Sequence, residues 1–165
     1  MRPIITAILT MMSTPALAGS LSEGLFGYKW GPLIEFPKPT EGVCSSTTMS
    51  GIPWVCERMI GETKVLAFFH WKQQTLFGVA IQATGFENCS SLWTTLTVAW
   101  GKPKGKYSDN PGVLEDSSWY VPGAGGTWTY NKYDSKCTAQ ILHIPSYERV
   151  TALERDKAAA GVKDL

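Results

Sequence analysis

The chain has 165 residues with 15 basic and 14 acidic side chains, so its formal net charge is +1. This near balance argues against nucleic-acid binding, because neutralising backbone phosphates requires a basic excess on some face of the protein. The length suits one domain with its own core, and 16 glycines, 10 prolines and 19 aromatic residues indicate many turns and a β-rich interior.

The first 18 residues are typical of a secretory signal peptide. A basic start at Arg2 precedes an apolar run over 4–12 and small residues at Ala16 and Ala18. The run would span about 14 Å as a helix, too short for a bilayer core of about 30 Å. The alternative is a buried core helix, which its terminal position and flanks disfavour. We expect cleavage after Ala18 and export to the periplasm or medium. The remaining single domain over 19–165 should have no stable membrane insertion. It carries 14 basic and 14 acidic residues, because cleavage removes one charged residue, Arg2.

The N-terminal part of this domain is predicted to consist of strands and turns. Residues 19–42 contain three prolines, which exclude a long helix or a central strand there. We expect one short edge strand at Leu25–Trp30 and an ordered loop over the rest. Residues 43–49 and 52–58 flank a Ser-Gly turn and predict a hairpin.

The clearest strand signal is an alternation of apolar and polar residues on both sides of a Lys-Gln-Gln turn. It predicts an antiparallel hairpin formed by Thr63–Trp71 and Leu76–Thr84. Leu66 and Phe68 fall on one face, which is therefore at least partly covered. The other face should carry the alternate apolar residues of both strands: Val65, Ala67, Phe69, Trp71, Phe77, Val79, Ile81 and Ala83.

The period then changes to that of a helix, which is predicted to end at Trp100. Asn88 is expected to cap its first turn, and Gly101 with Pro103 to stop it. Apolar residues recur at spacings of three and four, so they share one stripe that should lie across the preceding hairpin: Cys89, Leu92, Trp93, Leu96, Ala99 and Trp100.

Residues 102–118 are polar and contain prolines and glycines, which predicts a long exposed loop. Three further strands are expected after it, at Ser118–Val121, Thr127–Tyr133 and Lys136–Ile144. A tight Asp-Ser turn joins the last two strands.

A second helix is predicted to open at Pro145 and Ser146 and to fray over 158–165. Its buried side should consist of three residues at helical spacing: Tyr147, Val150 and Leu153. The order of strands, helix, strands and helix predicts an α+β fold, with an antiparallel sheet of about five to seven strands and two helices packed against it.

All four cysteines follow the predicted cleavage site, and an even count in an exported chain favours two disulfides. Cys44 and Cys56 lie too far apart in sequence for a Cys-x-x-Cys redox pair. Among three possible pairings we favour Cys44 with Cys56, on opposing arms of one hairpin. Cys89 would then pair with Cys137, because the helix stripe and the strand face that it covers bring the two together.

Several short motifs along residues 25–144 together resemble a broad group of small exported bacterial proteins, most of them without an assigned activity. There is also a distant similarity to helix-plus-sheet inhibitor modules and outer-membrane assembly modules. The resemblance implies an exported protein and carries over no catalytic residue. The motifs are Trp30-Gly31, Leu76-Phe77-Gly78-Val79, Trp100-Gly101-Lys102-Pro103, Trp119, the Gly-Gly-Thr-Trp strand at 125–128 and Cys137.

Residues able to perform catalysis are sparse. The histidines, His70 and His143, are expected to be partly buried strand residues, and no Gly-x-Ser-x-Gly elbow accompanies them. Neither the histidines nor the cysteines have metal-ligand spacing, so we expect neither a metal nor another cofactor. The acidic pairs Glu115-Asp116 and Glu154 with Asp156 suit solvated surfaces better than a glycosidase cleft.

Aromatic residues of the C-terminal strands give the one indication of binding. Trp128 and Tyr130 share a strand face, and Trp119 and Tyr120 lie near in sequence, as does Tyr133. Such rings either bind a protein or glycan partner or fill the core beneath the second helix. The sequence therefore favours a non-catalytic binding or inhibitor-like protein of the bacterial envelope, with a small periplasmic hydrolase, its site assembled from scattered residues, as the alternative.

Overall fold

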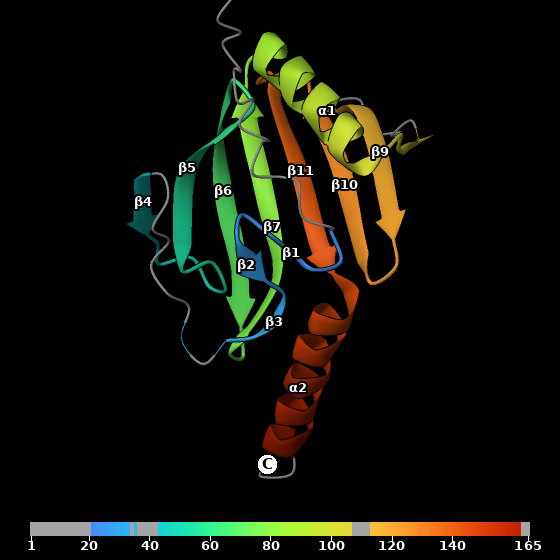
Figure 1. Ribbon diagram of the computed structural model, residues 1–165. Coiled ribbons are helices and arrows are strands. Elements are labelled where there is room, and N and C mark those ends of the chain that lie inside the picture. The colour runs from blue at the N-terminus through green and yellow to red at the C-terminus, as the bar shows by residue number, and fades with distance from the viewer. Residues whose placement is uncertain (1–20, 34, 36–42, 107–112, 163–165) are drawn as a thin grey trace, which may run out of the picture.

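A computed structural model describes residues 21–33, 35, 43–106 and 113–162, with the side chains of 105–116 left out. The predicted signal peptide therefore lies outside the described residues. Most strands join one antiparallel sheet of nine strands, in the order β4-β5-β6-β7-β11-β10-β9-β8, with β3 pairing to β7 (Figure 1). The fold is α+β with two helices, as expected, but the sheet has more strands than the predicted five to seven.

The strands account for most of the described chain. Their bounds are Gly24–Leu25 (β1), Tyr28–Lys29 (β2), Gly31–Pro32 (β3), Val43–Ser46 (β4), Trp54–Ile60 (β5), Thr63–Lys72 (β6), Thr75–Thr84 (β7), Lys104–Lys106 (β8), Val113–Val121 (β9), Ala124–Asn131 (β10) and Lys136–His143 (β11). The helices are Phe86–Trp100 (α1) and Ile144–Val162 (α2).

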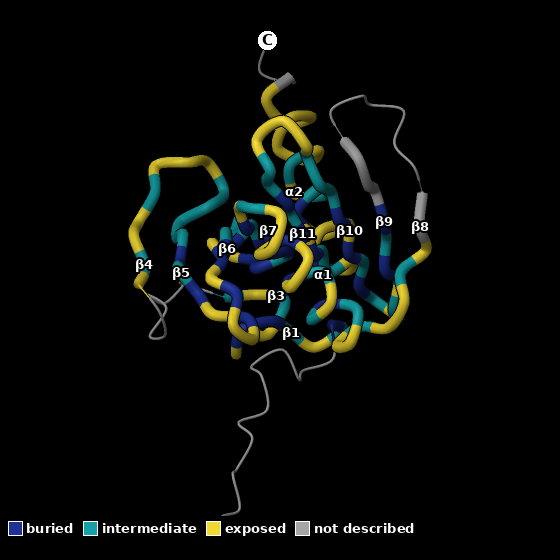
Figure 2. The backbone as a smooth tube through the Cα atoms, turned by 90° about the horizontal axis from the view of Figure 1, so that it is seen from above, coloured by how far each residue is buried: buried dark blue, intermediate teal, exposed yellow. Residues whose placement is uncertain are grey.

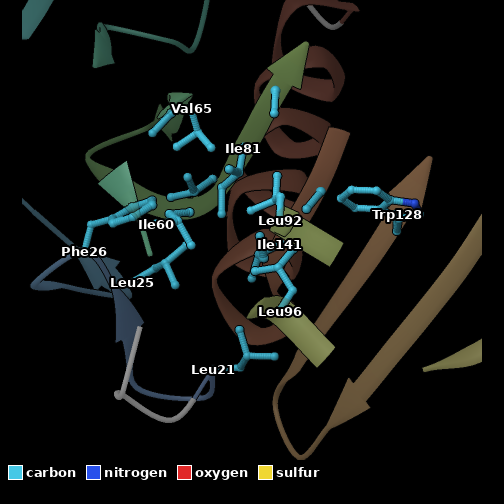
Figure 3. Close-up of a cluster of buried hydrophobic side chains, with 14 of the residues drawn as sticks. Leu21, Leu25, Phe26, Ile60, Val65, Ile81, Leu92, Leu96, Trp128 and Ile141 are labelled. Carbon is cyan, nitrogen blue, oxygen red and sulfur yellow. The ribbon is translucent and has the colours of Figure 1, made fainter. Parts of the chain in front are cut away.

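The two faces of the sheet are covered differently. Helix α1 and the N-terminal β1–β2 hairpin lie on one face, and α2 lies on the opposite side near one end of the strands (Figure 2). We call these the covered face and the outer face. The main hydrophobic cluster fills the covered face, where the N-terminal segment, α1 and the sheet contribute side chains together (Figure 3). Its members include Leu21, Leu25, Phe26, Ile60, Val65, Ile81, Leu92, Leu96, Trp128 and Ile141.

The N-terminal segment differs from the single edge strand predicted over Leu25–Trp30. It forms a small hairpin of β1 and β2, because Phe26 and Gly27 turn the chain with φ of 53° and 79°. This turn buries Phe26 together with Leu25. The Trp30 indole nitrogen donates a hydrogen bond to the Leu21 carbonyl at 2.7 Å, which closes the segment on itself.

Helix α1 begins earlier than the sequence pattern indicated. Gly85 occupies the position before its first residue, and the Asn88 amide donates to the Thr84 carbonyl at 2.8 Å rather than capping the helix by accepting a hydrogen bond. The helix stops before Gly101, where φ of 83° favours glycine, as expected. Its buried residues are Cys89, Leu92 and Leu96, whereas Ala99 of the predicted stripe is exposed.

Both disulfides have the expected pairing. Cys44 and Cys56 are direct partners across β4 and β5, with their Cα atoms 4.1 Å apart. Cys89 of α1 is bonded to Cys137 of β11, with a Cα separation of 5.7 Å. The first bridge fastens an edge strand to the sheet, and the second fixes α1 to the covered face.

Phe77 was predicted on the same face as Val79, and this is wrong. The register of β6 and β7 shifts between His70 and Trp71, so one residue of β7 is left without a partner. Such a bulge reverses the alternation of side chains beyond it. The Phe77 ring therefore contacts the rings of His70 and of Tyr147 in α2, at 5.8 and 6.0 Å between centroids, while Leu76 is fully buried.

The prediction of one loop over residues 102–118 is also wrong. Lys104–Lys106 forms β8 and pairs with β9, which starts at Val113 and continues through the predicted strand at Ser118–Val121. Residues 107–112 lie outside the described part of the chain. The polar composition suggested a loop because strands at the edge of a sheet are partly exposed to water and therefore tolerate polar residues.

Helix α2 projects beyond the end of the sheet (Figure 1). Val150 is buried as predicted, but Tyr147 and Leu153 remain 47% and 37% exposed. The helix is also held by an ion pair between Lys72 and Glu154. It continues to Val162, past the start of the predicted fraying over 158–165, of which 163–165 are not described. Within the described ranges, no helix is long and apolar enough to cross a membrane.

Loss of the α1 disulfide should destabilise the protein more than loss of the edge-strand disulfide. The bridges span 48 and 12 positions, which correspond to about 4 and about 3 kcal/mol on the chain-entropy model. Urea unfolding of Cys89→Ala/Cys137→Ala and Cys44→Ala/Cys56→Ala double variants measures both losses. A larger loss for the Cys44/Cys56 variant would contradict this role of the α1 bridge.

Candidate binding site

A groove of about 200 Å³ lies between the first turns of α1 and strand β10. Figure 1 shows α1 crossing the sheet above β11 and β10 at this place. The groove is lined by four aromatic side chains, one half of the α1 disulfide and one serine: Phe86, Trp93, Trp128, Tyr130, Cys89 and Ser90. None of these side chains is charged.

Two aromatic rings stand at the rim of the groove. Phe86 is the first residue of α1 and is 71% exposed, although it is large and apolar. Tyr130 is partly buried on β10, and its ring meets that of Phe86 edge to face at 6.4 Å. The rim thus presents aromatic surface to solvent from both a helix and a strand.

Tryptophan rings form the deeper wall. The Trp93 ring contacts both Trp119 and Trp128, with centroid distances of 5.4 and 5.3 Å. The Trp119 indole nitrogen donates to the Gly101 carbonyl at 2.8 Å, which ties the end of α1 to β9. The Trp128 indole nitrogen is buried and has no hydrogen-bond partner among the described residues. In Figure 3 this nitrogen lies on the side of the ring away from Leu92 and Ile141.

The four aromatic residues predicted to bind a partner do not form one surface. Trp119 and Trp128 are each only 2% exposed and fill the core, beneath α1 rather than beneath the second helix. Tyr120 is 69% exposed; it follows Trp119 in the same strand and therefore points to the opposite face. Only Trp128 and Tyr130 meet in the groove.

The sequence interpretation missed two groove residues. Trp93 belonged to the predicted helix stripe and was assigned to the core. Phe86 preceded the predicted start of the helix, so nothing placed it near Tyr130. Gly85, which the structure puts before the helix, was the available signal, because glycine is accepted at that position.

A second hollow of about 260 Å³ is lined by residues of β5, β6 and β7 and by Asn88 in the first turn of α1. Its two charged side chains, Glu57 and Lys64, already form an ion pair at 2.7 Å, in which Lys64 is exposed and Glu57 is half-buried. The remaining lining consists of Val65, Leu66, Gln82, Ala83, Thr84 and Asn88. This hollow offers neither an aromatic wall nor an unpaired buried group.

His143 is the histidine with a hydroxyl partner. Its Nδ1 lies 2.7 Å from Ser146 Oγ, and its ring stacks on Trp30 with 6.0 Å between centroids. Burial lowers the pKa of His143. Ser146 is only 4% exposed, so its hydroxyl is poorly placed to attack a substrate. The ion pairs of the described residues involve neither histidine, so no carboxylate among these residues pairs with His143 as in a hydrolytic triad.

His70 contacts the Phe77 ring, which in turn contacts Tyr147 of α2. Its Nε2 is buried without a hydrogen-bond partner in the described part of the chain. Desolvation by this burial lowers the pKa of His70 below its usual value of 6.5. We therefore assign His70 a structural position on the outer face.

The remaining sequence candidates add no site. Glu154 pairs with Lys72, and the side chains of Glu115 and Asp116 lie outside the described set. Among the described residues, no group of three or more histidines, cysteines or carboxylates is suited to a metal ion. Comparison with protein-family models, with curated proteins and with solved structures gives no match for this chain.

Acid should destabilise the fold through His70. In the unfolded chain this histidine takes up a proton near pH 6.5, but the folded state resists protonation because its pKa is lowered. The free energy of unfolding should therefore fall as the pH drops below about 6.5. Urea unfolding at pH 7.5 and 5.5 should show a smaller fall for His70→Gln than for the wild type. The pKa of His143 is lowered as well, so His143→Gln serves as the comparison that measures its separate contribution. If the free energy of unfolding of His70→Gln fell with pH as much as that of the wild type, the assignment would be contradicted.

Proposed function

We propose that this chain is an exported, non-catalytic binding protein of the bacterial envelope, and that the groove between α1 and β10 is its binding site. The observation that carries the proposal is the exposed aromatic rim of Phe86 and Tyr130 over an uncharged groove. The signal-peptide pattern and the two disulfides support export, because such bridges persist in oxidising compartments.

The energetics of Phe86 favour a binding role. Burying a phenylalanine side chain is worth about 1.5–3 kcal/mol, and this one is left mostly in water at the first turn of a helix. A partner that covers the ring would gain that free energy. Aromatic anchors surrounded by uncharged contacts are also typical of the residues that dominate binding interfaces.

A small periplasmic hydrolase is the second candidate, and the contact between His143 and Ser146 is the observation in its favour. The contact joins the last residue of β11 to a residue of the first turn of α2, three positions later, and the serine is buried. It also lies away from the groove lining. A Ser146→Ala variant separates the candidates: loss of a hydrolytic activity would support the enzyme, and unaffected ligand retention supports the binding protein.

Truncation of the groove rim should strongly weaken retention of the partner. Immobilised wild-type protein is incubated with periplasmic extract, alongside a Phe86→Ala/Tyr130→Ala variant and the matched control Tyr120→Ala, which removes an exposed aromatic ring from the outer face. Retention of the partner should fall at least about tenfold for the groove variant, since tenfold corresponds to only about 1.4 kcal/mol. The control should bind as the wild type does. Retention that depends on Tyr120 and not on the rim would place binding on the outer face.

A further inference from the structure

The size of the groove limits its occupant to a single ring. Its volume is about 200 Å³, whereas sites for drug-sized ligands usually occupy roughly 300–1,000 Å³. A cavity of about 150 Å³ is enough to bind benzene. The groove therefore suits one six-membered ring with its substituents, and a longer ligand must continue outside it.

The lining also selects against charge. Of the six lining residues, none carries a charged side chain, and placing a phosphate or carboxylate there without a partner would cost several kcal/mol. Hydroxyl groups are nevertheless present, at Ser90 on the exposed side of α1 and at Tyr130 on β10. The groove thus combines aromatic faces with neutral hydrogen-bonding groups.

The unpartnered Trp128 indole N–H indicates that the ligand should carry a hydrogen-bond acceptor. Trp128 is 98% buried, and a buried donor without an acceptor costs about 1–3 kcal/mol. A ligand that brings an oxygen atom to this N–H would recover that free energy. The nitrogen is buried in the free protein, so side chains of the groove lining must rearrange for this hydrogen bond to form. Phe86 is the wall that packing holds least, since most of its surface is exposed.

From these observations we infer that the groove binds one neutral pyranose ring of a glycan, an inference that rests on the proposed binding function. The apolar C–H face of a sugar ring packs on an aromatic side chain, and its hydroxyl groups supply the acceptor that Trp128 lacks and partners for Ser90 and Tyr130. An aliphatic or phenyl side chain from a protein would fill the same volume but leave the Trp128 N–H unpaired. A neutral sugar ring satisfies both features.

The test uses ¹H–¹⁵N spectra of the oxidised protein, in which each indole N–H gives its own signal. It is titrated with neutral oligosaccharides of glucose, mannose, galactose and N-acetylglucosamine, with a uronic-acid oligosaccharide, and with a short peptide that carries one phenylalanine. A neutral sugar should shift the Trp128 indole signal saturably, and the uronic-acid oligosaccharide should bind at least about tenfold more weakly.

Variants separate the groove from the rest of the surface. Phe86→Ala should weaken sugar binding at least about tenfold, and Tyr130→Phe with Ser90→Ala, which remove only hydroxyl groups, should weaken it several-fold. Both changes lie at partly or fully exposed positions, so the fold should persist, and Tyr120→Ala is the control that binds normally. Signals that respond to a sugar but do not depend on Phe86 would overturn the inference.

The outcomes also distinguish failure of the glycan assignment from failure of the proposed binding function. Failure of every neutral sugar, or binding of the peptide alone at the Trp128 signal, overturns the glycan assignment; rim-dependent retention from periplasmic extract would then still support a binding protein. Failure of the sugars together with retention that ignores Phe86 and Tyr130 overturns both.

Discussion

The packing of α1 across the sheet is the contact on which the rest of the structure depends. Leu92 and Leu96 press into the covered face, and the Cys89–Cys137 bridge fixes the first turns of the helix to β11. Because the bridge restrains the helix at one point and the leucines restrain it at others, its angle over β10 is determined. That angle leaves Phe86 above Tyr130 and brings Trp93 onto Trp119 and Trp128. The groove is therefore a consequence of how the helix covers the sheet.

The same arrangement explains why binding is assigned to one side of the sheet. On the covered face, helix α1 does not bury every aromatic ring, and the rings of Phe86 and Tyr130 remain in contact with solvent at its start. On the outer face, the Phe77 bulge supplies a ring for Tyr147 of α2, so aromatic surface there is used in docking the helix. Tyr120 remains exposed, but without aromatic neighbours among the described ring contacts.

Local pattern was enough to predict much of this fold. Alternation at Val65, Ala67 and Phe69 and the helical stripe at Cys89, Leu92 and Leu96 predicted the covered face. The hairpin over 43–58 predicted one disulfide, and the helical stripe together with the strand face of Cys137 predicted the other. Features decided by single residues were not predictable in this way. A one-residue bulge moved Phe77, and polar edge strands resembled a loop. The groove itself joins Phe86 to Tyr130 across 44 positions of sequence, a contact that depends on tertiary packing and leaves no periodic signal.

The most direct test of this account is the measurement of nuclear Overhauser effects from the Trp128 ring in the oxidised protein. We expect cross-peaks from its indole protons to Trp93 on α1, because the ring centroids lie 5.3 Å apart, together with cross-peaks between the Phe86 and Tyr130 rings. Cross-peaks from Trp128 to α2 side chains such as Val150, with none to α1, would contradict it, because the second helix and not the first would then cover these strands.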